Sequence, residues 1–111
     1  MEAVNITVDV QFICPAWVST LIAHDSRLTT MYRVYINDNL LTERSWIWTN
    51  NNFIQESIWI YAEKNSPYTI TLEPIVKHQC NGTFKLDNFK VANTPFTSEQ
   101  INDLHISFTL Q

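Results

Sequence analysis

The chain begins with a strict alternation of apolar and polar residues, Val4-Asn5-Ile6-Thr7-Val8-Asp9-Val10-Gln11-Phe12. Successive side chains of a β-strand point to opposite faces of the sheet, so the apolar members of this run share one face. Alternation of this length predicts a strand buried on one side only. Cys14 and Pro15 follow, and proline cannot donate to a strand ladder, so we expect the strand to end there.

Similar short patterns recur along the remaining sequence. They predict strands at residues 32–36, 40–48, 56–61, 68–75, 83–91 and 104–110. Residues 97–103 are expected to form one helical turn capped by Thr97 or Ser98, and residues 17–22 fit either a helical turn or a short strand. Seven or eight short strands predict an all-β, two-sheet antiparallel sandwich of jelly-roll or immunoglobulin-like type, spanning 1–111 as one domain. A closed barrel is the alternative.

The chain has a single glycine, Gly82, so we expect asparagine to take the place of glycine at the turns. Asparagine tolerates positive φ better than most residues. The expected turn asparagines are Asn37, Asn39, Asn50, Asn51, Asn52, Asn65, Asn81 and Asn93. At the first of these turns, a two-residue loop at Asp38-Asn39 would place Arg33 opposite Arg44. Like charges facing each other are unfavourable, so we expect a hairpin loop of a different length.

Charge and composition exclude several classes of protein. The net charge is −4, and the seven lysines and arginines are scattered, which argues against a nucleic-acid binder. No apolar run is long enough for a membrane-spanning helix, and the N-terminus lacks the pattern of a signal peptide. Cys14 and Cys80 are expected to be free thiols, with a disulfide between them as the alternative.

No catalytic or metal-binding pattern emerges from the sequence, so we expect no enzymatic activity, no cofactor and no metal. The adjacent residues His24, Asp25 and Ser26 cannot converge as a catalytic triad must. His78 and Cys80 are not part of a CxxC or HxxxH pattern, so they do not indicate a zinc site. The acidic residues Glu43, Glu56, Glu63 and Glu73 are expected on solvated strand faces. A hydrolase built on such carboxylates is a minor alternative, because no pair is positioned by the sequence.

The strongest functional signal is a repeated aromatic pattern, Trp46-Ile47-Trp48 and Trp59-Ile60-Tyr61. Each copy sets aromatic rings on one strand face and an isoleucine on the other. If Trp46 stood opposite Trp59 in an antiparallel pair, one face would collect the candidate binding residues Arg44, Trp46, Trp48, Trp59 and Tyr61, with the guanidinium able to stack on a ring. Two interpretations remain open: the rings fill the core, or they form a contact surface for protein or sugar.

Residues 82–91 (GTFKLDNFKV) resemble the closing strand of jelly-roll carbohydrate-binding modules, and residues 68–72 (YTITL) resemble a preceding strand. An aliphatic-Asp-Asn-aliphatic run near the end is common in that family. The resemblance implies a sugar platform made of aromatic side chains, for which Trp46, Trp48 and Trp59 are the candidates. It covers under a fifth of the chain, which also continues for twenty residues past the motif.

As a whole, the small, glycine-poor, Asn- and Ile-rich chain resembles accessory structural proteins of tailed-phage virions. This resemblance implies a non-enzymatic capsid-decoration, neck or tail component that is assembled in the host cytoplasm. Its implied partners are other virion proteins and copies of itself, with neither nucleic acid nor membrane, and a glycan is the alternative partner. The C-terminal strand is expected to add onto a neighbour's sheet.

Overall fold

The computed structural model describes residues 2–13, 30–46, 53–76 and 83–111, and within them all regular structure is β-strand. The predictions for residues 16–29, for Trp48 and for His78 and Cys80 lie outside the described residues, as do those for Cys14, Asn50–Asn52 and Asn81. The strands are β1 (Glu2–Ile13), β2 (Thr30–Ile36), β3 (Asn39–Trp46), β4 (Phe53–Ala62), β5 (Pro67–Val76), β6 (Thr83–Val91), β7 (Phe96–Asn102) and β8 (His105–Leu110).

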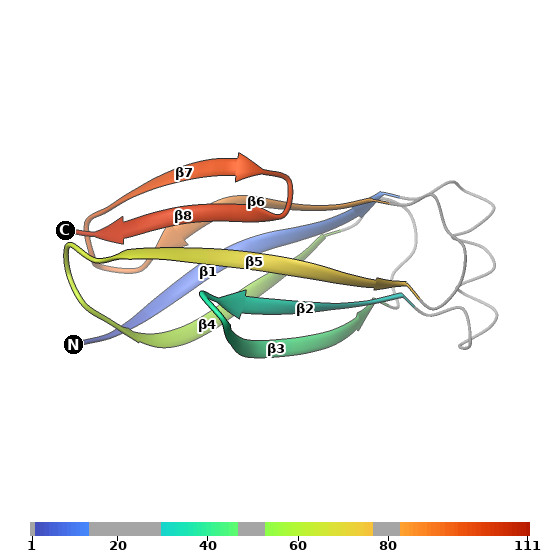
Figure 1. Ribbon diagram of the computed structural model, residues 1–111, viewed down its shortest axis with the longest axis horizontal. Helices are drawn as coiled ribbons and strands as arrows, with labels where there is room; N and C mark the ends of the chain where they lie inside the picture. Colours follow the sequence, from blue (N-terminus) through green and yellow to red (C-terminus); the bar gives the residue numbers. More distant parts are fainter. Residues whose placement is uncertain (1, 14–29, 47–52, 77–82) are drawn as a thin grey trace.

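These strands form two antiparallel sheets that lie face to face (Figure 1). The three-stranded sheet has the order β4-β1-β6, and the five-stranded sheet has the order β3-β2-β5-β8-β7. The predicted all-β sandwich is therefore confirmed, with eight strands in two separate sheets rather than a closed barrel. In Figure 1 the five-stranded sheet lies in front, and the strands of the smaller sheet run behind it.

The core lies between the sheets and follows the alternation seen in the sequence. The apolar row of β1 is buried, and β8 repeats the pattern from its second residue. The fully buried side chains of largest volume are Tyr32, Phe12, Phe108, Ile6, Ile70, Leu72, Leu86, Ile106, Leu110, Val8 and Val10. Aromatic rings link the two layers, since Phe89 of β6 lies 4.8 Å from Phe108 of β8 between ring centroids.

The β2–β3 hairpin resolves the expected charge conflict. Its turn consists of residues 37–38, and one extra residue, Leu41, is inserted in β3. A turn at 37–38 without the bulge would place Arg33 opposite Thr42, and the inserted residue shifts the register by one so that Arg33 faces Glu43. The expectation of a different loop length is wrong, since the turn still has two residues; it is shifted by one position to Asn37-Asp38, and an opposite-charge pair takes the place of a repulsive one.

Asparagine does occupy the left-handed positions of the backbone. In the described part of the chain, the non-glycine residues with positive φ are Asn37 (53°), Asn65 (64°), Asn88 (51°) and Asn93 (57°). Asn37 also joins its turn to β5, because its backbone N–H donates to the carbonyl of Thr69 (2.8 Å) and its side-chain Oδ1 accepts from the Thr69 N–H (3.0 Å). Three of the four were predicted as turn residues, whereas Asn88 was not.

Two sequence predictions are wrong in this part of the fold. Residues 97–103 do not form a helical turn, because β7 continues through them as a strand paired with β8. A cap stabilises a helix end by only about 1 kcal/mol, and here pairing along β8 competes with it. The C-terminal strand β8 is also not free to add to another sheet, since it lies between β5 and β7.

Candidate functional site: the outer face of β4

β4 presents aromatic side chains to solvent on the outer face of the three-stranded sheet. Trp59 is 70% exposed and Tyr61 is 75% exposed, whereas Ile60 between them is 9% exposed and belongs to the core. Phe53, at the start of the strand, is 56% exposed, and it shares the outer face because residues of equal parity point to the same side. Large exposed aromatics on one strand make this face the candidate site.

The expected pairing of Trp46 with Trp59 is wrong. Trp46 lies opposite Thr30 of β2, and Trp59 lies opposite Asn5 of β1, in the other sheet. The chain crosses from one sheet to the other between β3 and β4, so these strands are edges of different sheets. Periodicity shows which side chains share a face of a strand, but it does not identify the neighbouring strand, which tertiary packing decides. Of the five predicted binding residues, Trp59 and Tyr61 remain together on one face.

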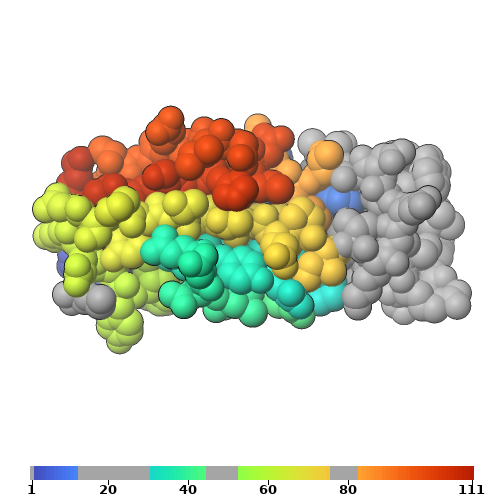
Figure 2. Space-filling view, viewed as in Figure 1, coloured from blue at the N-terminus to red at the C-terminus, as the bar shows by residue number. Residues whose placement is uncertain are grey.

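An open groove of about 300 Å³ adjoins the two rings. Its walls come from β4, from the end of the β2–β3 hairpin and from the start of β5, and its lining residues are Ile36, Asn37, Asn39, Leu41, Trp59, Ile60, Tyr61 and Tyr68. In Figure 2, atoms in the yellow-green of β4 and the following turn form the lower left margin of the molecule. The groove combines aromatic walls with the amide-bearing residues Asn37 and Asn39, a mixture of apolar surface and polar groups typical of binding sites.

Arg44 takes part in an ion pair between the two sheets. Its Nε donates to Oε1 of Glu56 and its Nη2 donates to Oε2 at 3.1 Å. Glu56 is 3% exposed, and the hydroxyl of Tyr32 donates to its Oε1 at 2.5 Å. The expectation that Glu56 lies on a solvated face is wrong: it points inward from β4 and binds side chains of β2 and β3. This network ties the edges of the two sheets together.

The same network perturbs two pKa values. Burial raises the pKa of Tyr32 well above its usual range, and the neighbouring Glu56 carboxylate raises it further by accepting the phenolic hydrogen bond and by its charge. The hydrogen bond to Glu56 also raises the pKa of Arg44. Tyr32 is therefore held as a neutral donor and Arg44 as a cation, which satisfies the buried carboxylate.

We expect Tyr32→Phe to change how stability responds to alkaline pH. Above about pH 10 an unfolded chain loses the tyrosine proton, whereas the folded protein retains it at position 32. The stabilising contribution is present below that pH and is lost as pH rises, by up to about 1.4 kcal/mol per pH unit. Denaturant unfolding between pH 8 and 11 should show a shallower decline for Tyr32→Phe than for the natural chain. Parallel declines would contradict this assignment.

A second polar contact joins Asn88 of β6 to Asp9 of β1, at an irregularity in the β1–β6 ladder. Asn88 is part of a bulge opposite Val8, and its Nδ2 donates to Oδ2 of Asp9 at 2.8 Å. Asp9, 8% exposed, faces Asp87 directly across the ladder. The Asp87-Asn88 pair, which carries the jelly-roll resemblance, thus lies at the bulge, where the Asn88 amide binds the Asp9 carboxylate. The alternation had placed Asp9 on the solvated face of β1, and no sequence signal indicated its burial.

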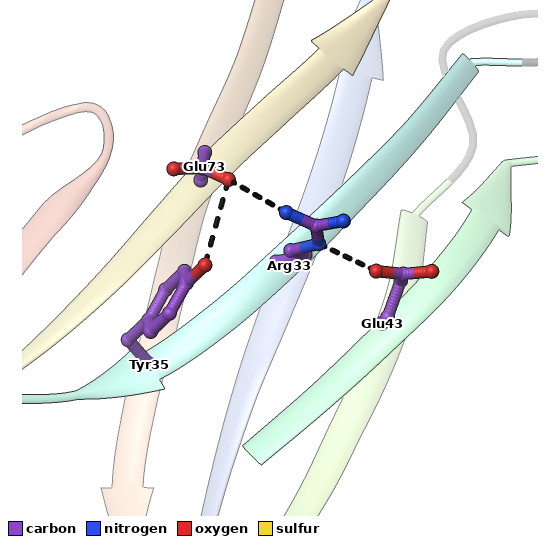
Figure 3. Close-up of polar contacts among 4 residues, drawn as sticks. All are labelled: Arg33, Tyr35, Glu43 and Glu73. Atoms are coloured by element: carbon purple, nitrogen blue, oxygen red, sulfur yellow. Dashed lines mark hydrogen bonds and ion pairs between the residues drawn. The ribbon is translucent and has the colours of Figure 1, made fainter. Parts of the chain in front are cut away.

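A surface ion cluster spans three strands of the larger sheet (Figure 3). Arg33 of β2 binds Glu43 of β3 at 2.5 Å and reaches Glu73 of β5 at 3.5 Å, and the Tyr35 hydroxyl also donates to Glu73 at 3.5 Å. All three charged side chains are more than one third exposed. Water screens such pairs strongly, so the cluster fixes the register of β2 more than it stabilises the fold.

Within the residues that the structure describes, His, Cys, Asp and Glu side chains form no group of three suited to a metal ion. The described residues also contain no helix that could span a membrane. Comparisons with protein-family models, with curated proteins and with solved structures give no match for this chain. The geometry of β4 and its surroundings is therefore the basis for any functional assignment.

Proposed function

We propose that this protein is a non-enzymatic accessory component of a virion that acts through protein–protein contacts made by the outer face of β4. The observation that carries the proposal is the exposure of Trp59 and Tyr61, at 70% and 75%, on one face of one strand. Aromatic residues are enriched in protein interfaces and are frequent among the residues that contribute most of the binding energy. Exposed apolar patches are typical of surfaces that bind a partner.

The backbone beneath these rings supports a preorganised contact. β4 pairs with β1 without interruption from Ala62 to Phe53, and Glu56 anchors the strand to the other sheet through Arg44 and Tyr32. Rings held on a rigid strand lose little conformational entropy on binding. The virion setting is supported by the resemblance in size and composition, and genes for a capsid or tail-tube protein beside this gene are the expected genomic context.

The contact can be tested by hydroxyl-radical footprinting of the isolated protein and of purified particles that contain it. Oxidation of Trp59 and Tyr61 is expected to fall several-fold in the particle, because a partner surface would exclude water from both rings. Tyr35, on the outer face of the other sheet, should be oxidised equally in both samples. Equal oxidation of Trp59 and Tyr61 in both samples would exclude the outer face of β4 as the contact.

Carbohydrate binding is the second candidate, and the groove beside Trp59 and Tyr61 is the observation that favours it. The faces of the two rings can pack on sugar C–H groups, while the amides of Asn37 and Asn39 can hydrogen-bond hydroxyl groups. On a glycan array, hits from the natural chain that disappear with Trp59→Ala would support this function. An array without hits, or one unchanged by Trp59→Ala, would exclude it.

A further inference from the structure

Within the described residues the two sheets have four edge strands, and three of them carry an irregularity that hinders pairing with another chain. An extra residue lies in β3, in β6 and in β7, at Leu41, within Asn88–Phe89 and at Ile101 respectively. These three edges also bear charged side chains, among them Glu43, Lys85, Lys90 and Glu99. Bulges and charges are the usual devices by which edge strands avoid pairing with other chains.

β4 has no bulge along its ten residues, and its one charged side chain points into the protein instead of along the edge. Its ladder with β1 runs in unbroken register from Glu2↔Ala62 to Gln11↔Phe53. The strand, Phe-Ile-Gln-Glu-Ser-Ile-Trp-Ile-Tyr-Ala, contains no lysine, arginine, proline or glycine, and its single charge, Glu56, is bound by Arg44. Among the described strands only β1 pairs with it, so its other side presents a regular row of backbone donors and acceptors.

The sequence of β4 is also self-complementary about its centre. Antiparallel pairing of two copies around a two-fold axis at Ser57 would place Phe53 opposite Tyr61 and Ile54 opposite Ile60 of the second copy. Gln55 would face Trp59, and Glu56 would face Ile58, so no like charges would meet. Aromatic and aliphatic cross-strand pairs of this kind are the favourable ones in antiparallel sheets, and a two-fold interface requires this self-complementarity.

We propose that β4 pairs with β4 of a second copy of this chain around an axis at Ser57, joining two three-stranded sheets into one six-stranded sheet. The inference rests on the proposed contact function and deepens it by naming one partner as the chain itself. Pairing uses the backbone edge of β4, so the outer-face rings of both copies lie on one continuous surface. Two Trp59–Tyr61 sets related by the axis then form a larger contact area than one chain offers.

The test introduces a charged residue at the two-fold axis, where residue 57 of one copy faces residue 57 of the other. The full-length natural chain is expected to be a dimer by light scattering coupled to size-exclusion chromatography. Ser57→Lys and Ser57→Asp, each alone, should weaken the dimer by at least about tenfold, since like charges would stand directly opposite. An equimolar mixture of the two variants should restore the dimer, because the charges are then opposite. Thr97→Lys, on the exposed edge strand β7, is the matched control and should remain dimeric.

A natural chain that stays monomeric would overturn the inference, as would a mixture that stays dissociated while both variants keep their β-sheet circular dichroism. Ser57 is exposed and accepts one side-chain hydrogen bond, from Asn5 at 3.0 Å, so both variants are expected to fold. Footprinting at Trp59 and Tyr61 reads the proposed contact function separately, because the isolated protein, in which β4 is already self-paired, is the reference for the particle. If the natural chain is monomeric while Trp59 and Tyr61 are protected in the particle, self-pairing is refuted and the proposed contact function stands.

Discussion

Phe108→Ala is expected to lower the free energy of unfolding by about 4 kcal/mol. Phe108 is 1% exposed, and its ring lies 4.8 Å from Phe89 of the other sheet and 5.5 Å from Tyr68 on β5, between ring centroids. Removing the ring takes away buried apolar area and leaves a cavity at the junction of three strands. Domains of this size are stable by roughly 5–15 kcal/mol, so the variant loses a large part of its stability.

Urea unfolding monitored by circular dichroism measures this loss, and Ile101→Ala is the matched control. Ile101 is 56% exposed on edge strand β7, so its removal should change the unfolding free energy by no more than about 0.5 kcal/mol. A loss below about 1 kcal/mol for Phe108→Ala would show that the sheets do not pack through this ring.

Arg44→Ala is expected to cost about 2 kcal/mol, because it leaves the buried carboxylate of Glu56 with the Tyr32 hydroxyl as its remaining described partner. Breaking a fully buried ion pair costs about 3–5 kcal/mol. The Arg44 side chain is 45% exposed, so water already screens part of the interaction and the expected loss is smaller.

Arg33→Ala provides the matched control, since Arg33 also binds a glutamate of a neighbouring strand but both partners are exposed. A much smaller loss is expected for it. Adding Glu56→Gln to Arg44→Ala should recover part of the stability, because the uncompensated buried charge is then removed. Equal losses for Arg44→Ala and Arg33→Ala would contradict the inter-sheet role of Glu56.

Local alternation was sufficient to predict the fold class and most strands. The pattern of residues 4–12 predicted β1 and its buried face, and residues 83–91 match β6 in full. Like-charge repulsion between Arg33 and Arg44 correctly excluded one hairpin loop. These predictions depend on neighbours along the chain, where the chemistry of adjacent residues determines face and turn.

The residues of the candidate site could not be predicted from the sequence, because they depend on which strands become neighbours in the fold. Trp46 and Trp59 lie close along the chain, but they belong to edge strands of opposite sheets. Glu56 looked like an ordinary surface carboxylate until β2 and β3 brought Tyr32 and Arg44 to it. The predicted strand at residues 56–61 did not include Phe53, because the partner that extends β4 is β1, more than forty positions away.

The order of the strands has a consequence for synthesis. β1 precedes the other described strands in the sequence, yet it pairs with β4 and β6, whose partner residues run as far as Val91. The larger sheet contains the local hairpins β2–β3 and β7–β8, whereas the smaller sheet consists entirely of distant pairings, the kind that slow folding. Among the described strands, one edge of β1 therefore stays unpaired until β4 has been made, and the other stays unpaired until β6 has been made.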